Sequence, residues 1–411
     1  MSLRLPVPAA IGAVVYGPDH PPEALLEDFA AELIARGFRI GGLTQTTRTG
    51  DDGCKCAMEV TELDTGRRLS LSQALGAGSN SCSLDPTALA EASGALRRPV
   101  AAHRAGEPVD LLFVNKFSKA EKAGRGLSAE MLEAMAAGVP MLTAIPGVFV
   151  EDWVQFTGGQ GQLLMPAREA LWRWWGPERL YDDLALGVGE GVARRVVVGF
   201  NWILVEGPDG VGLAQTPERG GPACKALAGD WSGRPLRDLA ALVRSWDPIE
   251  AAVGVAALNA HYNRFDLAGE TVNGLDALDG DPARLVVIGA FPGLTERLPG
   301  ARVVDRRPGP GQYPAEAAQW LLPQAEGVLI TASALANRSL PDLLRRCGHA
   351  PAVLVGPGAP LTPRLFDYGL TVLSGLVATD VEGLARVVAE GGGAKDLKRF
   401  ARPVTLRAGA R

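Results

Sequence analysis

The fold of this chain is decided by a stretch near its start that reads AAIGAVVYGPDHPPEALLEDFAAELIARG, residues 9–37. Ala9–Tyr16 are almost all apolar and stop at a Gly-Pro pair, which is typical of a buried strand. In Glu23–Arg36 the apolar residues recur every three or four positions, which predicts a helix with one buried face. Gly37 is suited to end that helix. A buried strand followed by a helix is the unit of a parallel sheet, so the sequence predicts an α/β fold.

The same alternation continues along the chain on both sides of a different central segment. In the first part, further strands are expected at 40–44, 109–115 and 139–145, with a helix at 131–137. In the last part, strands are expected at 285–288, 301–304, 327–330, 352–355 and 371–373, with helices at 313–322, 340–347 and 381–390. The last part is therefore predicted to be a doubly wound, Rossmann-like sheet.

The central segment predicts a small α+β domain. Strands at 196–205 and 212–215 flank the turn signal Pro208-Asp209-Gly210, and helices are expected at 236–244 and 248–259. Before it, Trp172, Trp174 and Trp175 lie on a short amphipathic helix, and three tryptophans so close together indicate packing against a neighbour. The predicted domains are an N-terminal parallel α/β domain at 1–166, a linker helix at 167–191, the small α+β domain at 192–264 and the Rossmann-like domain at 265–411.

Composition excludes several classes of protein. The chain has 411 residues, of which 47% are hydrophobic, so it is not a disordered protein. Its 41 basic and 46 acidic side chains nearly cancel, so no general charge favours nucleic acid or an anionic membrane. No apolar run approaches the roughly 18–20 residues of a membrane-spanning helix. Five cysteines and the absence of a signal-peptide pattern predict a protein of the reducing cytoplasm.

Polar residues and glycines follow the predicted strands of the last domain. In doubly wound sheets, ligands bind outside the carboxyl ends of the strands, where backbone N–H groups suit an anion or a small polar molecule. The alternative is that these residues form turns and helix caps. The candidate ligand-binding residues there are Gly289, Asp305, Thr331, Ser333, Asn337, Gly356 and Gly358.

Cysteines mark the candidate metal ligands of the first domain. They are Cys54, Cys56 and Cys82, although two cysteines at C-x-C spacing on a strand point to opposite faces, and the paired C-x-x-C pattern of zinc sites is absent. Incidental thiols are therefore the alternative. The loop before Cys82 offers Ser79, Asn80 and Ser81, whose N–H groups are candidate donors to a tetrahedral anion.

The loop after the first strand does not match a nucleotide phosphate loop. Residues 17–24 contain no second glycine, lysine or hydroxyl, all of which hold phosphate and magnesium in such loops. Asn115-Lys116 follows the third strand, where a magnesium-binding acid is expected, and Ser118 replaces the acid of a guanine-reading N-K-x-D motif. Hydrolysis of a nucleoside triphosphate is therefore not expected.

Two runs carry a resemblance to a known family in the second half of the chain. Thr331–Leu340 and Val355–Gly369, supported by Gly207–Thr216 and Leu285–Phe291, resemble the heavy-metal-chelation domain family, in which a small enolase-N-terminal-like domain precedes a Rossmann-like domain. The resemblance covers residues 196–400, about half the chain. Gln312 stands where that family is expected to carry an acid, so a carboxylate ligand is in doubt there.

A second resemblance covers the first part of the chain. Ala13–Tyr16, Gly42–Gln45, Cys82–Asp85 and Asn115–Phe117, with Glu121 and Gly124–Gly126, are similar to an uncharacterised NTPase-like domain family associated with molybdenum transport. The resemblance implies a degenerate relative of the P-loop proteins, a nucleotide or oxyanion ligand and a molybdenum context. It assigns no activity and no site residues.

The leading hypothesis is a binding protein for a metal or a metal oxyanion, molybdate or a related species, acting in metal homeostasis or cofactor supply. Molybdate is a tetrahedral dianion, so backbone donors would hold it and Lys116 and Arg125 would add charge. One alternative is a nucleotide- or cofactor-dependent enzyme of metal-cofactor assembly, and another is a scaffold that dimerises through the tryptophan helix. The expected partners are a small ion or small molecule and a second copy of the chain, without nucleic acid or membrane insertion.

Overall fold

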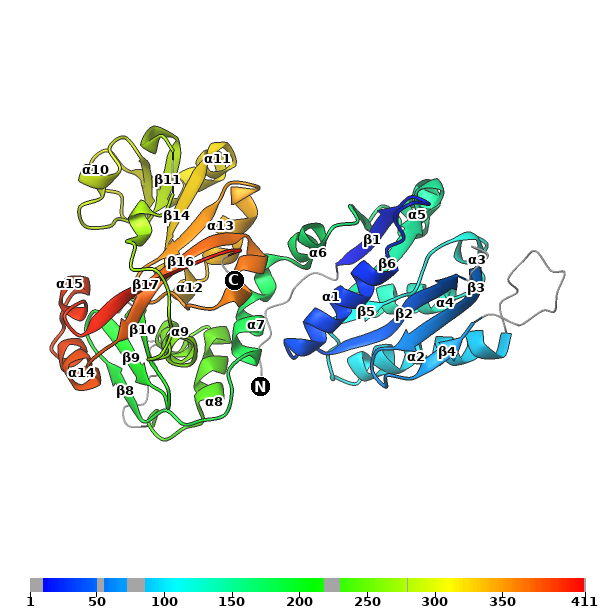
Figure 1. Cartoon of the computed structure of the whole chain (residues 1–411), viewed down its shortest axis with the longest axis horizontal. Helices are drawn as coiled ribbons and strands as arrows, with labels where there is room; N and C mark the ends of the chain where they lie inside the picture. The colour runs from blue at the N-terminus through cyan, green and yellow to red at the C-terminus, as the bar shows by residue number, and fades with distance from the viewer. Residues whose placement is uncertain (1–9, 50–54, 72–85, 218–229, 279, 410–411) are drawn as a thin grey trace. The chain divides into compact units, whose positions relative to one another are not determined.

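The computed structural model describes residues 10–49, 55–71, 86–217, 230–278 and 280–409, and the statements below concern these residues. The chain is an α/β protein that divides between Trp175 and Gly176 into two compact units, each with its own seven-stranded sheet (Figure 1). This division falls inside the segment that the sequence assigns to a linker helix. The predicted small domain and the Rossmann-like domain lie together in the second unit.

The first unit has the strand order β4-β3-β2-β5-β6-β1-β7. Its strands β2, β5, β6, β1 and β7 are parallel, whereas β3 and β4 add an antiparallel extension that the sequence did not reveal. The strands are β1 (Ile11–Tyr16), β2 (Ile40–Thr49), β3 (Lys55–Glu62), β4 (Arg68–Ser70), β5 (Leu111–Phe113), β6 (Met141–Pro146) and β7 (Gln162–Leu164). The helices are α1 (Glu23–Ala35), α2 (Pro86–Arg104), α3 (Lys119–Lys122), α4 (Ser128–Ala136), α5 (Val150–Phe156) and α6 (Arg168–Trp175).

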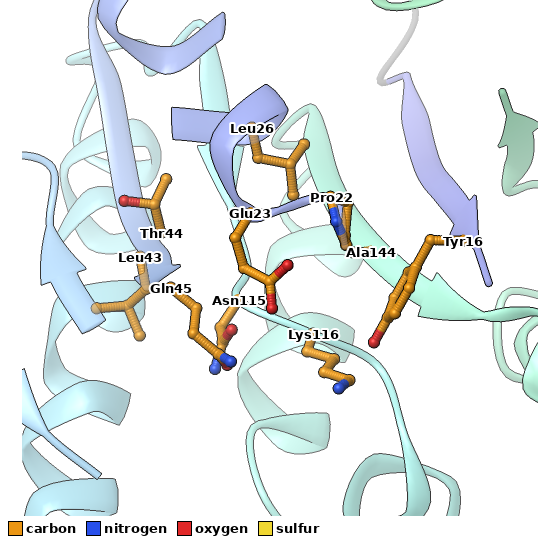
Figure 2. Close-up of a pocket in the computed structure, with 10 residues that line it drawn as sticks. All are labelled: Tyr16, Pro22, Glu23, Leu26, Leu43, Thr44, Gln45, Asn115, Lys116 and Ala144. Atoms are coloured by element: carbon orange, nitrogen blue, oxygen red, sulfur yellow. The ribbon is translucent and has the colours of Figure 1, made fainter. Parts of the chain in front are cut away.

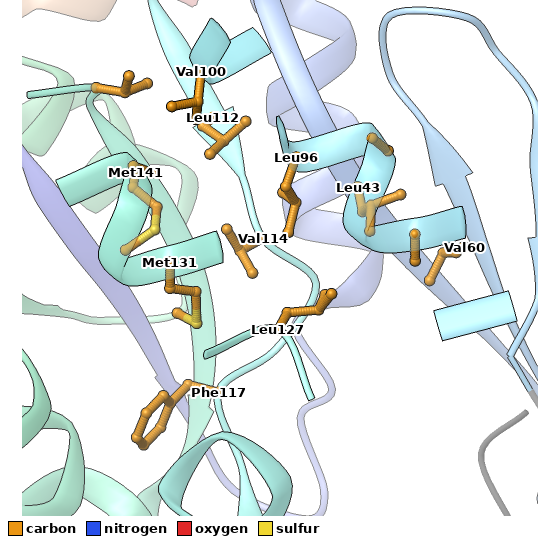
Figure 3. Close-up of a cluster of buried hydrophobic side chains, with 14 of the residues drawn as sticks. Leu43, Val60, Leu96, Val100, Leu112, Val114, Phe117, Leu127, Met131 and Met141 are labelled. Atoms are coloured by element: carbon orange, nitrogen blue, oxygen red, sulfur yellow. The ribbon is translucent and has the colours of Figure 1, made fainter. Parts of the chain in front are cut away.

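Helices cover both faces of this sheet. On one face, α2 and α4 bury a cluster that includes Leu96 and Met131 against the strands (Figure 3). Trp153 of α5 belongs to the same cluster. On the other face, α1 and α6 meet through Phe29, whose ring lies 5.5 Å from that of Trp172, edge to face. Burial of apolar surface on both faces is what stabilises a parallel sheet.

The tryptophan helix packs inside the first unit. Trp172, Trp174 and Trp175 are each exposed by 8% or less, and an added Cβ on Gly12 of β1 would lie 2.6 Å from the Trp174 indole. The expected packing against a neighbour is confirmed. The hypothesis that these tryptophans form a dimer surface is wrong, because their own unit already buries them.

The second unit begins with a three-stranded antiparallel sheet of order β10-β9-β8. The single strand predicted over 196–205 is wrong, because a turn at residues 199–201 splits it into β8 and β9. Gly199 donates its N–H to the carbonyl of Trp202 to close this turn, and a Cβ there would collide with the backbone of Val388. The elements of this part are α7 (Leu180–Leu186), β8 (Arg195–Val198), β9 (Trp202–Glu206), β10 (Val211–Gln215), α8 (Leu236–Ala240) and α9 (Pro248–Tyr262).

The larger sheet of the second unit has the order β13-β12-β11-β14-β15-β16-β17, all parallel except β17. Its strands are β11 (Leu285–Ile288), β12 (Arg302–Asp305), β13 (Tyr313–Pro314), β14 (Gly327–Thr331), β15 (Ala352–Val355), β16 (Leu370–Ala378) and β17 (Ala401–Arg407). Its helices are α10 (Leu294–Arg297), α11 (Ala318–Leu321), α12 (Ser333–Ala336), α13 (Leu340–Cys347), α14 (Val381–Ala389) and α15 (Ala394–Leu397). The helix predicted over 313–322 is shorter than expected, because the residue before a proline favours an extended backbone and Tyr313-Pro314 pairs with β12.

A buried ion pair connects α7 to the part of the second unit that contains the larger sheet. The Asp183 carboxylate is completely buried and pairs with the Arg364 guanidinium. Its second oxygen accepts the O–H of Tyr368 at 2.9 Å. Because removal of one partner leaves an uncompensated buried charge, this pair is costly to break even where it adds little net stability.

We therefore predict that Arg364→Ala lowers the free energy of unfolding of the second unit by about 3–5 kcal/mol. Urea denaturation followed by circular dichroism measures this loss. The matched control is Arg284→Ala, which breaks an exposed pair with Glu326 and should cost less than about 1 kcal/mol. Equal losses in the two variants would contradict the importance of burial.

Candidate functional site

A hollow of the second unit lies between the three-stranded sheet and two loops of the larger sheet. The loops follow the carboxyl ends of the neighbouring parallel strands β14 and β15. Together with open solvent the hollow encloses about 280 Å³. It brings together four of the predicted ligand-binding residues, Thr331, Ser333, Gly356 and Gly358. The other lining residues are Trp202, Ala214, Gln215, Val255, Ala332, Ala336 and Pro357.

Among the residues that the structure describes, those lining this hollow are all neutral. Trp202 and Gln215 are directly opposed on β9 and β10, so their side chains share one face of the small sheet. Opposite them, the hydroxyls of Ser333 and Thr331 lie 3.2 Å apart, Ser333 donating. Hydroxyl and amide groups of this kind bind polar ligands without fixing a net charge, so the hollow suits a small hydrogen-bonding species.

The remaining predicted residues of this edge shape the loops. An added Cβ on Gly289, after β11, would lie 2.7 Å from Thr331 Cγ2, so this glycine allows the two loops to approach closely. The Asp305 carboxylate accepts the N–H groups of Ala290 at 2.9 Å and Arg307 at 2.8 Å, and thus braces the loop after β11.

Asn337 closes a turn after α12. Its Oδ1 accepts both the N–H and the hydroxyl of Ser339, at 3.0 and 2.7 Å. It does not line the hollow, and for Asn337 and Asp305 the turn and cap alternative describes the observed contacts.

A second hollow lies in the first unit, below the start of α1 and beyond the carboxyl ends of β1, β5 and β6 (Figure 2). Lys116 is half-buried there, and its ammonium lies 5.4 Å from the centre of the Tyr16 ring. Burial and the nearby Glu23 carboxylate raise the pKa of Tyr16 to about 12, so its phenol stays protonated near neutral pH. The other lining residues are Pro22, Leu26, Leu43, Thr44, Gln45, Asn115 and Ala144.

The start of α1 does not resemble a phosphate cradle. Pro18, Pro21 and Pro22 have no N–H to offer, and Glu23 occupies the first helical position with its carboxylate toward the hollow (Figure 2). A helix N-terminus favours an anion, but here the protein supplies its own. A phosphate group at this position would meet like charge.

Gly126, next to Arg125, has a structural role. The Glu121 carboxylate is buried and accepts the N–H of Ser118 at 3.0 Å and that of Leu127 at 3.3 Å. Gly126 packs so tightly on this carboxylate that a Cβ would lie 2.1 Å from Glu121 Oε1. Arg125 itself is exposed on this turn and does not line the hollow that holds Lys116.

The predicted metal ligands fall largely outside the described residues. Cys54, Cys82, Ser79, Asn80 and Ser81 lie there, and Cys56 is described only by its backbone in β3. In the described part of the chain, no three His, Cys, Asp or Glu side chains gather as they would around a metal ion.

One other cysteine is described in full. Cys347, on α13, is buried, and burial raises the pKa of its thiol to about 12. A thiol of this kind is neither a reactive nucleophile nor a ready metal ligand, because the thiolate is the reactive and ligating form.

Several lining residues were missed by sequence reasoning. From the sequence, Tyr16 is expected at the end of a strand, Glu23 at the start of a helix, and Trp202 and Gln215 within strands. Because such residues lie at or near strand and helix ends, their positions in the sequence could have indicated that they line a site. The packing of the small sheet beside the larger one could not be predicted from the sequence, because no local pattern specifies it.

Three family models match the chain. The family DUF2478, a "Protein of unknown function", matches residues 11–174. The families DUF4213 and DUF364, both described as "Putative heavy-metal chelation", match residues 181–262 and 275–407. Each match lies within one of the two structural units.

A curated relative and two solved structures are similar to parts of the chain. "Molybdenum import ATP-binding protein ModC 2" of Bradyrhizobium diazoefficiens is 43% identical over 168 residues, which are 41% of this chain but only 18% of that protein. A DUF364 protein of unknown function from Desulfitobacterium hafniense is 30% identical, with a TM-score of 0.51, over 56% of this chain and 98% of that one. A Pyrococcus horikoshii member of the same family is 19% identical with a TM-score of 0.49, over 56% of this chain and 98% of that one.

Among the helices that the structure describes, none combines the length and the apolar character needed to cross a membrane.

The close approach of Gly289 to Thr331 predicts a specific cost. Gly289→Ala adds a methyl group at φ 96° that overlaps Thr331, so we expect a loss of about 1–3 kcal/mol in the free energy of unfolding.

The matched control for this prediction is Gly300→Ala. Its φ is 85°, and its Cβ would meet nothing closer than 3.8 Å, so it carries the backbone strain without the overlap. Denaturant titration of both variants measures the difference. A Gly300→Ala variant as unstable as Gly289→Ala would show that only the backbone conformation matters.

Proposed function

The chain belongs, through its second unit, to the DUF364 family, and from this premise we propose that it binds a metal in the form of an oxyanion such as molybdate. The family description names heavy metals. The first unit matches part of a relative whose name refers to molybdenum import, which supports molybdate as the species. The role is that of a binding protein in metal homeostasis or cofactor supply.

The observation that carries the proposal is the neutral hollow lined by Thr331, Ser333, Gly358 and Gln215. A bare divalent cation needs several carboxylate, imidazole or thiolate ligands, and this lining offers none. An oxyanion needs hydrogen-bond donors instead, and hydroxyl, amide and backbone N–H groups are such donors.

Two glycines bring the backbone close to this hollow. Gly356 and Gly358 allow the loop after β15 to lie close to Ala332 and β10, respectively, so the backbone itself forms part of the wall. A tetrahedral dianion bound here would be surrounded by donors on the two opposing sides.

The first unit supports a protein that binds its ligand without hydrolysing a nucleoside triphosphate. Glu23 and the preceding prolines take the position where a nucleotide phosphate would be cradled, and no lysine follows a glycine loop there. Release of phosphate from ATP by the pure protein would therefore speak against this reading.

We predict that the full chain binds sodium molybdate and sodium tungstate in isothermal titration calorimetry more tightly than Zn²⁺, Ni²⁺ or Co²⁺. Thr331→Val and Ser333→Ala should each weaken molybdate binding by about ten- to a hundred-fold, because a hydrogen bond to a charged group contributes about 1.5–3 kcal/mol.

The control for these variants is Thr371→Val, which removes a hydroxyl that bonds the Ala352 carbonyl on β15 and does not line the hollow. It should bind molybdate as the unaltered chain does. The proposal fails if no oxyanion binds, if the divalent cations bind more tightly than molybdate, or if the two hydroxyl variants leave molybdate binding unchanged.

A further inference from the structure

The hollow of the first unit is lined by both a positive and a negative side chain, whereas the described lining of the second unit's hollow is neutral. Lys116 and Glu23 both line it. Among the residues that the structure describes, no carboxylate lies within ion-pair distance of the Lys116 ammonium, which lies over the Tyr16 ring instead. The two opposite charges therefore face one space without neutralising each other directly.

Donors and acceptors are also separated within this hollow. Lys116 and Tyr16 lie side by side and form the donor part, since the phenol remains protonated. Glu23 and Asn115 lie together on the other side and form the acceptor part (Figure 2).

Asn115 adds an independent sign of a missing donor. Its Oδ1 is buried and has no hydrogen-bond partner among the described residues. A buried acceptor left without a donor costs about 1–3 kcal/mol, so such an atom marks a place where a ligand or a water donates an N–H or O–H group.

We propose that this hollow binds a small zwitterion, namely the ammonium and carboxylate groups of a free α-amino acid. The ammonium donates to the Glu23 carboxylate and to Asn115 Oδ1. The carboxylate accepts from the Lys116 ammonium and from the Tyr16 hydroxyl. The apolar lining residues Pro22, Leu26, Leu43 and Ala144 are suited to contact an aliphatic side chain.

Ligands of a single charge fit this arrangement less well. A phosphate or other oxyanion would pair with Lys116 but would meet the like charge of Glu23. An amine or a metal cation would pair with Glu23 but would meet Lys116.

The experiment uses the full chain and the twenty standard L-amino acids as probes, one at a time, in a thermal-shift screen followed by calorimetry. We expect at least one amino acid to bind. The amine that lacks its carboxylate and the carboxylic acid that lacks its amine should each bind at least ten-fold more weakly. This comparison needs no variant, so it remains decisive if a substitution impairs folding.

Variants then assign the charges. Glu23→Gln and Lys116→Met should each weaken binding of that amino acid by at least ten-fold, because each removes a charge-assisted hydrogen bond. The controls are Glu27→Gln, an exposed position one turn further along α1, and Lys119→Met, an exposed position on α3. Neither control should change the affinity.

Three results would overturn the inference: no amino acid binds, the acid alone binds as tightly as the zwitterion, or the Glu23 and Lys116 variants bind as the controls do. The inference does not depend on the oxyanion proposal. Thr331→Val changes only the second unit's hollow, so it should leave amino-acid binding intact, and molybdate binding should survive Lys116→Met.

Discussion

The second unit depends on two buried amides that tie its smaller sheet to its larger one. Asn259, on α9, donates to the carbonyl oxygens of Leu213 at 2.7 Å and Gly358 at 2.9 Å. Asn263, one helical turn further on, accepts the N–H of Leu361 at 2.9 Å. Both side chains are almost completely buried, so each bond forms away from competing water. The neutral hollow has two fixed walls because these amides hold β10 and the loop after β15 together.

The same fold position carries different chemistry in the two units. In each, the hollow lies at the carboxyl ends of parallel strands, where loops converge and helices begin. In the second unit the strand-end loops supply hydroxyls and glycines. In the first, they supply a lysine, a carboxylate, a phenol and an amide. The sheet therefore fixes where the hollow lies. The residues at the strand ends determine whether its lining is neutral or contains both a positive and a negative charge.

Much of the fold was readable from periodicity. The strands 285–288 and 352–355 and the helix 340–347 lie where the sequence places them, because each is a short apolar run or an amphipathic run with clear ends. The break at residues 199–201 was not readable, since it depends on the contact between Gly199 and Val388, which are distant in the chain. The predicted residues Thr331, Ser333, Gly356 and Gly358 do meet in one hollow, because neighbouring parallel strands end side by side. Asp305 accepts the N–H of Ala290 in the neighbouring loop, and Asn337 accepts that of Ser339 in its own turn; residue type alone does not distinguish such roles from ligand binding.

The neutrality of the second unit's hollow has a consequence for how a metal would be handled. A bare metal ion held by thiolates or carboxylates is bound tightly, because the ligands carry charge of the opposite sign. An oxyanion held only by neutral donors loses its hydration without gaining a counter-charge, so its binding depends on the number and direction of hydrogen bonds. Such a site would discriminate between ions by their shape. In this chain the loops are positioned by Asn259 and by the contact of Gly289 with Thr331, so the geometry of the backbone, rather than any charged side chain, would set the affinity.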